Sequence, residues 1–162
     1  MALPGLVVFD LDFTLWDCGG LWIDSTSHPF IVGADGQVSD SRGRRFRLYE
    51  EVEEILDQLE SAGIPLALAS RTERPDWAGE LLKLWALENR FCYHEIYPES
   101  KVAHFESLRE RTGISFQEMV FFDDEERNIS EVGGLGVHCH HVKRGVTLSL
   151  IESALKSFSE NV

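Results

Sequence analysis

The chain has 162 residues, 43% hydrophobic and 27% charged, a composition that excludes an intrinsically disordered protein and predicts a globular one. Fifteen lysines and arginines against 28 aspartates and glutamates give a net charge of -13, which argues against nucleic acid or an anionic membrane as a partner. Three scattered cysteines, Cys18, Cys92 and Cys139, are expected to be free thiols in a reducing compartment, so we expect a cytoplasmic protein. We also expect it to be a monomer.

No apolar run approaches the roughly 20 residues that span a bilayer. The opening MALPGLVVFDL lacks the basic flank and the cleavage site of a secretory signal, so no membrane partner or export is expected.

An apolar run over residues 5–10, GLVVFD, is the first predicted strand, and it ends in aspartate. Residues 17–47 have no helical stripe and are rich in Gly, Asp and Ser, which predicts a small β-rich insert directly after this strand. Within the insert, FIVGADGQVSD is typical of a hairpin that turns near Asp35 and Gly36. We expect the insert to lie over the carboxyl edge of the sheet.

The rest of the chain alternates between amphipathic segments, which predict helices, and short apolar runs, which predict strands buried on both faces of a parallel sheet. The order predicts an α/β fold: one three-layer Rossmann-like domain over residues 1–162 with a mostly parallel sheet. The expected elements are helix 48–63, strand 64–70, helix 75–88, strand 93–98, helix 100–113, strand 119–124, short helix 125–134, strand 136–142 and helix 147–158.

Polar residues follow the predicted strands, and in an open α/β sheet ligands bind beyond the carboxyl ends of the strands. We therefore expect one edge of the sheet to gather carboxylates, a hydroxyl and cations. The candidates are Asp10, Asp12, Thr14, Ser70, Arg71, Lys101, Asp123 and Asp124.

Clustered carboxylates repel one another, and a hard cation such as Mg²⁺, which prefers oxygen ligands, relieves the repulsion. With the metal bound, a phosphate dianion can approach and a carboxylate can attack phosphorus. Ser70 would donate to a phosphoryl oxygen, and Lys101 would neutralise charge on the equatorial oxygens. The pattern predicts magnesium-dependent phosphate chemistry in an otherwise acidic protein.

Four motifs, DLDFT, LALAS, the lysine of ESK and VFFDD, stand in the order and spacing of the haloacid dehalogenase superfamily across roughly residues 5–130. The chain resembles the small magnesium-dependent phosphatases of that superfamily. The resemblance implies that Asp10 is the nucleophile and forms a phosphoaspartyl intermediate. It implies that Asp12 is the general acid/base, with its backbone carbonyl on the metal, and that Thr14 supports the loop.

The same resemblance implies that Ser70 and Lys101 bind the phosphate. Arg71 directly follows Ser70, so we expect it to contact the substrate near the phosphate. Asp10, Asp12 and Asp123 would hold Mg²⁺, and Asp124 would be an outer partner of Lys101 or of a metal-bound water. For Arg71 a salt bridge to a carboxylate at the edge is the alternative. The short insert stands in place of a cap domain, which leaves the site open to bulky substrates.

The function implied is magnesium-dependent hydrolysis of a phosphate monoester. The resemblance points to two substrate classes, protein phosphotyrosine and sugar phosphates, including fructosamine phosphates formed by glycation. Two rivals remain: a catalytically silent module that binds phosphorylated ligands, and a phosphotransferase. The silent module is disfavoured because the candidate residues are all intact.

Further side chains have two interpretations each. Arg44 and Arg45 of RGRRFR either steer anionic substrates or are solvated. Trp16, Trp22 and Phe30 either pack the insert onto the domain or line the entrance to the site. Two more tryptophans, Trp77 and Trp85, are expected in the core. A zinc site at HCHH lacks an identifiable third ligand, so only magnesium is expected.

Overall fold

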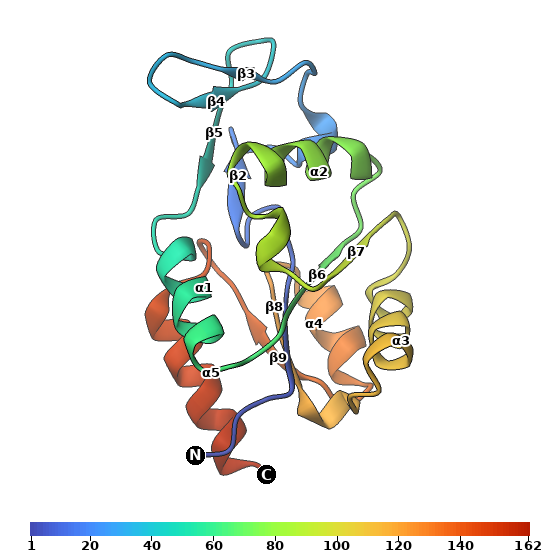
Figure 1. The fold of residues 1–162 in the computed structure, drawn as a ribbon. Coiled ribbons are helices and arrows are strands. Elements are labelled where there is room, and N and C mark those ends of the chain that lie inside the picture. Colours follow the sequence, from blue (N-terminus) through green and yellow to red (C-terminus); the bar gives the residue numbers. More distant parts are fainter.

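The computed structural model describes residues 1–162 and contains two separate sheets (Figure 1). The main sheet has five parallel strands in the order β7-β6-β1-β8-β9. Its members are β1 (Leu6–Phe9), β6 (Leu66–Ser70), β7 (Tyr93–Ile96), β8 (Met119–Asp123) and β9 (His138–His141). The order reverses at β1, and the crevice at such a switch point is where open α/β sheets bind ligands.

Helices cover both faces of this sheet (Figure 1). They are α1 (Val52–Ser61), α2 (Pro75–Leu84), α3 (Lys101–Thr112), α4 (Glu126–Gly133) and α5 (Leu148–Glu160), with short 3₁₀ turns at Ile23–Ser25, Glu88–Arg90 and Phe116–Glu118. The predicted three-layer α/β fold with a mostly parallel sheet is confirmed. None of the helices combines the length and the hydrophobicity needed to cross a bilayer.

The strand β1 separates two cores because successive side chains of a strand point to opposite faces. Val7 and Phe9 belong to the larger core, which includes α1, α2 and α5, whereas Leu6 and Val8 belong to a smaller one with α3 and α4. All four side chains are fully buried. Burying a side chain of this size contributes about 1.5–3 kcal/mol to the free energy of unfolding. Because both faces of β1 are buried, its sequence is a continuous apolar run rather than an alternating one.

The second sheet is the predicted insert. Its strands β2 (Trp16–Cys18), β3 (Ile31–Val32), β4 (Val38–Ser39) and β5 (Arg45–Leu48) are antiparallel in the order β2-β5-β4-β3. The hairpin is found where it was predicted: Ile31 pairs with Ser39, and Gly36 in the turn has a φ of +79°. The strands β3 and β4 lie at one end of the molecule, beyond α2, and β2 runs beside α2 toward the main sheet (Figure 1).

Two element boundaries differ from the sequence prediction by more than two residues. The helix expected from residue 48 begins at Val52, because Leu48 lies opposite Trp16 in the antiparallel pairing of β5 with β2. The helix expected to reach residue 88 ends at Leu84, and Ala86 has a left-handed φ of +55° that a helix does not allow. The second sheet therefore runs from residue 16 to residue 48.

Contacts with α2 and the loop before it hold the insert in place. His28 Nε2 lies 2.7 Å from Glu80 Oε2, and the His28 ring stacks on Trp77 with ring centroids 5.2 Å apart. The amide of Glu73 donates to Asp24 Oδ2 at 3.2 Å. The insert is thus docked on the helical layer at several points.

Candidate active site

Asp10 and Asp123 come together because their strands are neighbours. Phe9 of β1 lies opposite Phe122 of β8, and the amide of Asp10 donates to the carbonyl of Phe122 at 3.0 Å. Carboxylate oxygens of Asp10, Asp123 and Asp124 all lie within 4.8 Å of one another. The parallel register therefore gathers three acidic groups at the carboxyl edge of the sheet.

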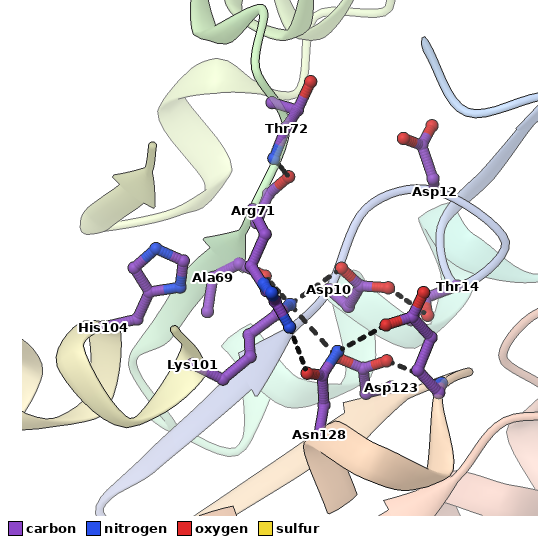
Figure 2. Close-up of polar contacts among 12 residues, drawn as sticks. Asp10, Asp12, Thr14, Ala69, Arg71, Thr72, Lys101, His104, Asp123 and Asn128 are labelled. Carbon is purple, nitrogen blue, oxygen red and sulfur yellow. Dashed lines mark hydrogen bonds and ion pairs between the residues drawn. The ribbon is translucent and has the colours of Figure 1, made fainter. Parts of the chain in front are cut away.

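Lys101 joins this cluster from α3 (Figure 2). The helix begins at Lys101 because the hydroxyl of Ser100 accepts the amide of Ala103 at 3.2 Å as a side-chain cap. The ammonium Nζ lies 2.9 Å from Asp10 Oδ1 and 3.1 Å from Asp123 Oδ2, and the side chain is 1% exposed. Burial alone would lower the pKa of Lys101, but the two carboxylates outweigh it and raise the pKa, so the amine stays charged.

Asn128 on α4 orients Asp123. Its amide nitrogen donates to Asp123 Oδ2 at 3.1 Å, and its amide oxygen accepts from Arg71 Nη1 at 3.3 Å. The backbone amide of Glu125 donates to Asp123 Oδ1 at 2.8 Å. Asn128 is buried and was missed in the sequence, where only its position in the first turn of a helix after an acidic strand end could have indicated it.

The acidic cluster carries more negative charge than Lys101 balances. Burial raises the pKa of Asp123 and of Asp124, and in both cases the charge of Asp10 adds to the rise. Such hard, crowded oxygen donors suit Mg²⁺, which takes carboxylate ligands and keeps positions for water or phosphate. The donor set therefore fits the predicted metal, with Asp124 a member of the cluster and Lys101 paired to Asp10 and Asp123.

Asp12 is the one acidic candidate that turns away from this cluster (Figure 2). Its carboxylate accepts from Trp16 Nε1 at 2.8 Å and from the amide of Ile23 at 3.1–3.2 Å. The next residue, Phe13, has a φ of +61°, a strained conformation that redirects the chain after Asp12. Burial raises the pKa of Asp12 to about 7 against the opposing hydrogen bonds, so the group can hold a proton near neutral pH.

Three hydroxyl groups complete the edge. Thr14 Oγ1 donates to Asp10 Oδ2 at 3.1 Å. Ser70 ends β6 and is buried, and its Oγ accepts the amide of Thr72 at 3.3 Å, which leaves the hydroxyl proton free to donate. The hydroxyl of Thr72 accepts the amide of Arg74 at 3.1 Å and shapes the loop that follows β6.

A cavity of about 540 Å³ opens at this edge of the sheet, and Ser70 and Thr72 are among the residues that line it. Trp22 is its only hydrophobic lining residue and is 54% exposed. Three arginines contribute to the walls, Arg71, Arg74 and Arg127. The full lining is Asp10, Asp12, Trp22, Asp24, Ser25, Ser70, Arg71, Thr72, Glu73, Arg74, Lys101, Asp124, Glu125, Arg127 and Asn128.

Of the aromatic and basic residues of the insert, only Trp22 lines the cavity. Trp16 is fully buried, and Phe30 packs against Trp77 and Phe46 away from the cavity, whereas Trp22 faces it. Arg44 pairs with Asp40 at 2.8 Å. The four arginines of RGRRFR do not line the cavity; they are Arg42, Arg44, Arg45 and Arg47.

The remaining tryptophans and the histidine run lie outside the cavity. Trp77 and Trp85, expected in the core, are half-buried and pack against it. The histidine-rich strand β9 contributes no residue to the cavity or to the cluster of possible metal ligands.

Comparisons with known proteins show the family of the chain. A family model described as acid phosphatase matches residues 2–161. Magnesium-dependent phosphatase 1 of Homo sapiens is 48% identical over 159 residues, covering 98% of this chain and 89% of the human protein. A HAD-like hydrolase superfamily protein of Schizosaccharomyces pombe is 38% identical over 149 residues, covering 85% of this chain and 84% of the yeast protein.

The solved structure of a haloacid dehalogenase-like hydrolase from Streptococcus pneumoniae covers 99% of each chain with a TM-score of 0.64 at 13% identity, which supports the fold. The superfamily resemblance that the four motifs indicated is thereby confirmed. The chain belongs to the acid phosphatase family of haloacid dehalogenase-like hydrolases.

Proposed function

We propose that the protein is a magnesium-dependent phosphatase that hydrolyses phosphate monoesters through a phosphoaspartyl intermediate on Asp10. The observation that carries the proposal is the buried contact of Lys101 with both Asp10 and Asp123 beside Asp124. The name of the human relative, a magnesium-dependent phosphatase, supports the same activity and cofactor.

The residues divide the chemistry as follows. Asp10 attacks phosphorus, the bond to the leaving oxygen breaks with its electron pair on that oxygen, and Asp12 supplies the proton. Water then attacks the phosphoaspartate, Asp12 takes a proton from it, and inorganic phosphate leaves with Asp10 restored. Mg²⁺ held by Asp10, Asp123 and the backbone of Asp12 would offset the negative charge that meets the phosphate.

The groups around the cluster of Asp10, Asp123 and Asp124 bind the phosphate in this proposal. The Ser70 hydroxyl donates to one phosphoryl oxygen, and the Lys101 ammonium stabilises charge on the equatorial oxygens during transfer. Arg71 lines the cavity with its guanidinium on Asn128, within the same side-chain network as Asp123, and we assign it to the phosphate as well. Thr14 fixes the orientation of the nucleophile through its bond to Asp10.

Sugar phosphates, including fructosamine phosphates, are the substrate class that we favour. The cavity has a single hydrophobic lining residue, Trp22, so a polyhydroxylated leaving group finds many hydrogen-bond partners and a phenyl ring finds one apolar wall. Protein phosphotyrosine is the second candidate, because Trp22 is 54% exposed and its ring is available for stacking. Comparing kcat/KM for a panel of sugar phosphates and phosphotyrosyl peptides decides between them.

The proposal predicts the response to metal removal and to two substitutions. Turnover of p-nitrophenyl phosphate should vanish with EDTA and return with Mg²⁺. Asp10→Asn should abolish turnover because an amide does not form the acyl phosphate, whereas Asp12→Asn should lose about 100- to 10,000-fold through the missing acid/base. Full activity in EDTA, or wild-type turnover by Asp10→Asn, would contradict the proposal. A silent binding module predicts no turnover by the wild type.

A further inference from the structure

The insert supplies the groups that hold the Asp12 side chain. Trp16, the first residue of β2, donates through Nε1 to Asp12 Oδ1 at 2.8 Å, and Ile23 of the following 3₁₀ turn donates through its amide to both oxygens. The thiol of Cys18 lies 4.0 Å from the same Oδ1. Asp12 itself stands on the loop after β1 of the main sheet, so these contacts join the two sheets at this carboxyl group.

Trp16 is well suited to fix a neighbour because it does not move easily. Its side chain is fully buried, and its ring lies 5.8 Å from that of Trp85. Its backbone carbonyl accepts the amide of Phe13 at 2.7 Å, so the indole and the residue after Asp12 are held to each other as well. A rigid donor of this kind limits the carboxyl group to one orientation.

The pattern of donors also distinguishes the two oxygens of Asp12. Oδ1 accepts from the indole at 2.8 Å, has the thiol of Cys18 at 4.0 Å, and shares the amide hydrogen of Ile23, at 3.2 Å, with Oδ2. Oδ2 has only the shared amide at 3.1 Å. A proton on the Asp12 carboxyl therefore belongs on Oδ2.

We propose that Trp16 is a positioning residue that orients the Asp12 carboxyl and directs its proton to Oδ2 for transfer to the leaving oxygen. The insert thereby completes the catalytic group of the main sheet as well as forming the rim of the cavity. This inference rests on the proposed function, in which Asp12 is the general acid.

The test uses the dependence of rate on the leaving group, since proton donation matters more when the leaving oxygen is more basic. Values of kcat/KM with Mg²⁺ are measured for p-nitrophenyl phosphate and phenyl phosphate, which differ little in shape. Trp16→Phe keeps an aromatic ring and removes the N–H. We expect the ratio of the two values to shift against phenyl phosphate by about tenfold, a part of the 100- to 10,000-fold that acid catalysis supplies.

Trp85→Phe is the matched control, because it makes the same change in the ring that contacts Trp16 and has no bond to Asp12. Its ratio should stay at the wild-type value. The ratio is independent of the folded fraction of a preparation, so a loss of stability alone leaves it unchanged. Should Trp16→Phe fail to fold, 3-benzothienylalanine at position 16 removes the N–H at nearly constant volume, and the same shift is expected.

Asp12→Asn in the same assay separates the inference from the proposed function. If it leaves the ratio unchanged, Asp12 is not the acid, and both the assigned mechanism and the inference fail. If Asp12→Asn shifts the ratio but Trp16→Phe or the isostere lowers both values equally or leaves both unchanged, Trp16 is only a packing residue, and the inference alone is overturned.

Discussion

His104 lies one helical turn after Lys101 and is fully buried. Its Nε2 faces the carbonyl of Tyr97 at 3.0 Å, so that nitrogen carries the proton, and Nδ1 has no hydrogen-bond partner. Burial, with the positive charge of Lys101 adding to it, lowers the pKa of His104 to about 4. The native protein therefore keeps this ring neutral where an unfolded chain would protonate it.

We expect His104 to make the protein less stable as the pH falls. Below about pH 6.5 the His104 ring binds a proton in the unfolded chain, whereas in the native state it stays neutral down to about pH 4. The free energy of unfolding therefore decreases as the pH falls through that window. The loss between pH 7 and pH 5 amounts to about 2 kcal/mol in the free energy of unfolding. His104→Gln should remove this component in urea titrations at the two pH values.

The matched control for this prediction is His94→Gln, the same change at an exposed position, which should keep the wild-type pH dependence. Equal pH dependence in wild type and His104→Gln would show that the buried ring does not govern acid stability.

At the same scale, the sequence indicates residues whose role follows from their position along the chain. Asp10 directly follows β1, and Ser70 and Asp123 end β6 and β8 on either side of it, so the parallel sheet brings the three residues to one edge. Asn128 and Trp16 could not be found in this way. Beyond the place of Asn128 in the first turn of a helix, nothing in the sequence indicates their contacts. These depend on how α4 packs against β8 and on the left-handed φ of Phe13.

The insert is a docked element, and its position places one side chain in the cavity. The pair His28 and Glu80 and the stack on Trp77 fix the insert on α2, while Trp22 faces the cavity. Substrates that extend beyond the phosphate should therefore contact Trp22.

Trp22→Ala should lower kcat/KM for such substrates by roughly 10- to 100-fold, from about 1–3 kcal/mol per lost contact, mainly through KM. The inhibition constant of inorganic phosphate should not change, because phosphate alone does not reach the indole. Ile31→Ala, an exposed change in the insert outside the cavity, is the control. Unchanged kcat/KM across the panel in Trp22→Ala would exclude the insert from substrate recognition.

Element boundaries could be predicted where the hydrophobic periodicity agrees with the capping and stop residues. The α3 helix begins and ends as expected because Ser100 caps it and Gly113 stops it with a φ of +72°. The predicted start of α1 at residue 48 was wrong because Leu48 fits the apolar stripe of a helix as well as it fits a strand. The alternation in RFRL, with Phe46 buried between exposed arginines, is typical of a strand. Pairing with β2 stabilises this segment as the strand β5.

The whole molecule has a net charge of -13, which repels a phosphate dianion. A phosphate site in such a protein needs cations close to the phosphate. In the proposed mechanism, Lys101, Arg71 and a divalent metal would supply that local charge. Without metal, the crowded carboxylates of Asp10, Asp123 and Asp124 destabilise the native state, as the raised pKa of Asp124 indicates.

Mg²⁺ should therefore raise the melting temperature, since a ligand that binds only the native state at 100 times its Kd adds about 2.7 kcal/mol. Asp124→Asn should raise the metal-free melting temperature and reduce the shift caused by Mg²⁺. Asp24→Asn, which lies in the cavity but outside the cluster, should keep the wild-type shift. A Mg²⁺ shift that is the same in all three proteins would show that Asp124 takes no part in holding the metal.

The central claim, that phosphate passes through Asp10, is tested most directly by trapping the phosphoenzyme. The protein with Mg²⁺ is mixed with ³²P-labelled phosphate monoester, quenched in acid within one turnover and digested, and the labelled peptide is identified. We predict an acid-stable, hydroxylamine-labile label on the peptide that contains Asp10, absent in Asp10→Asn and accumulating in Asp12→Asn with a good leaving group. Label on another residue, or turnover by Asp10→Asn at the wild-type rate, would contradict the account.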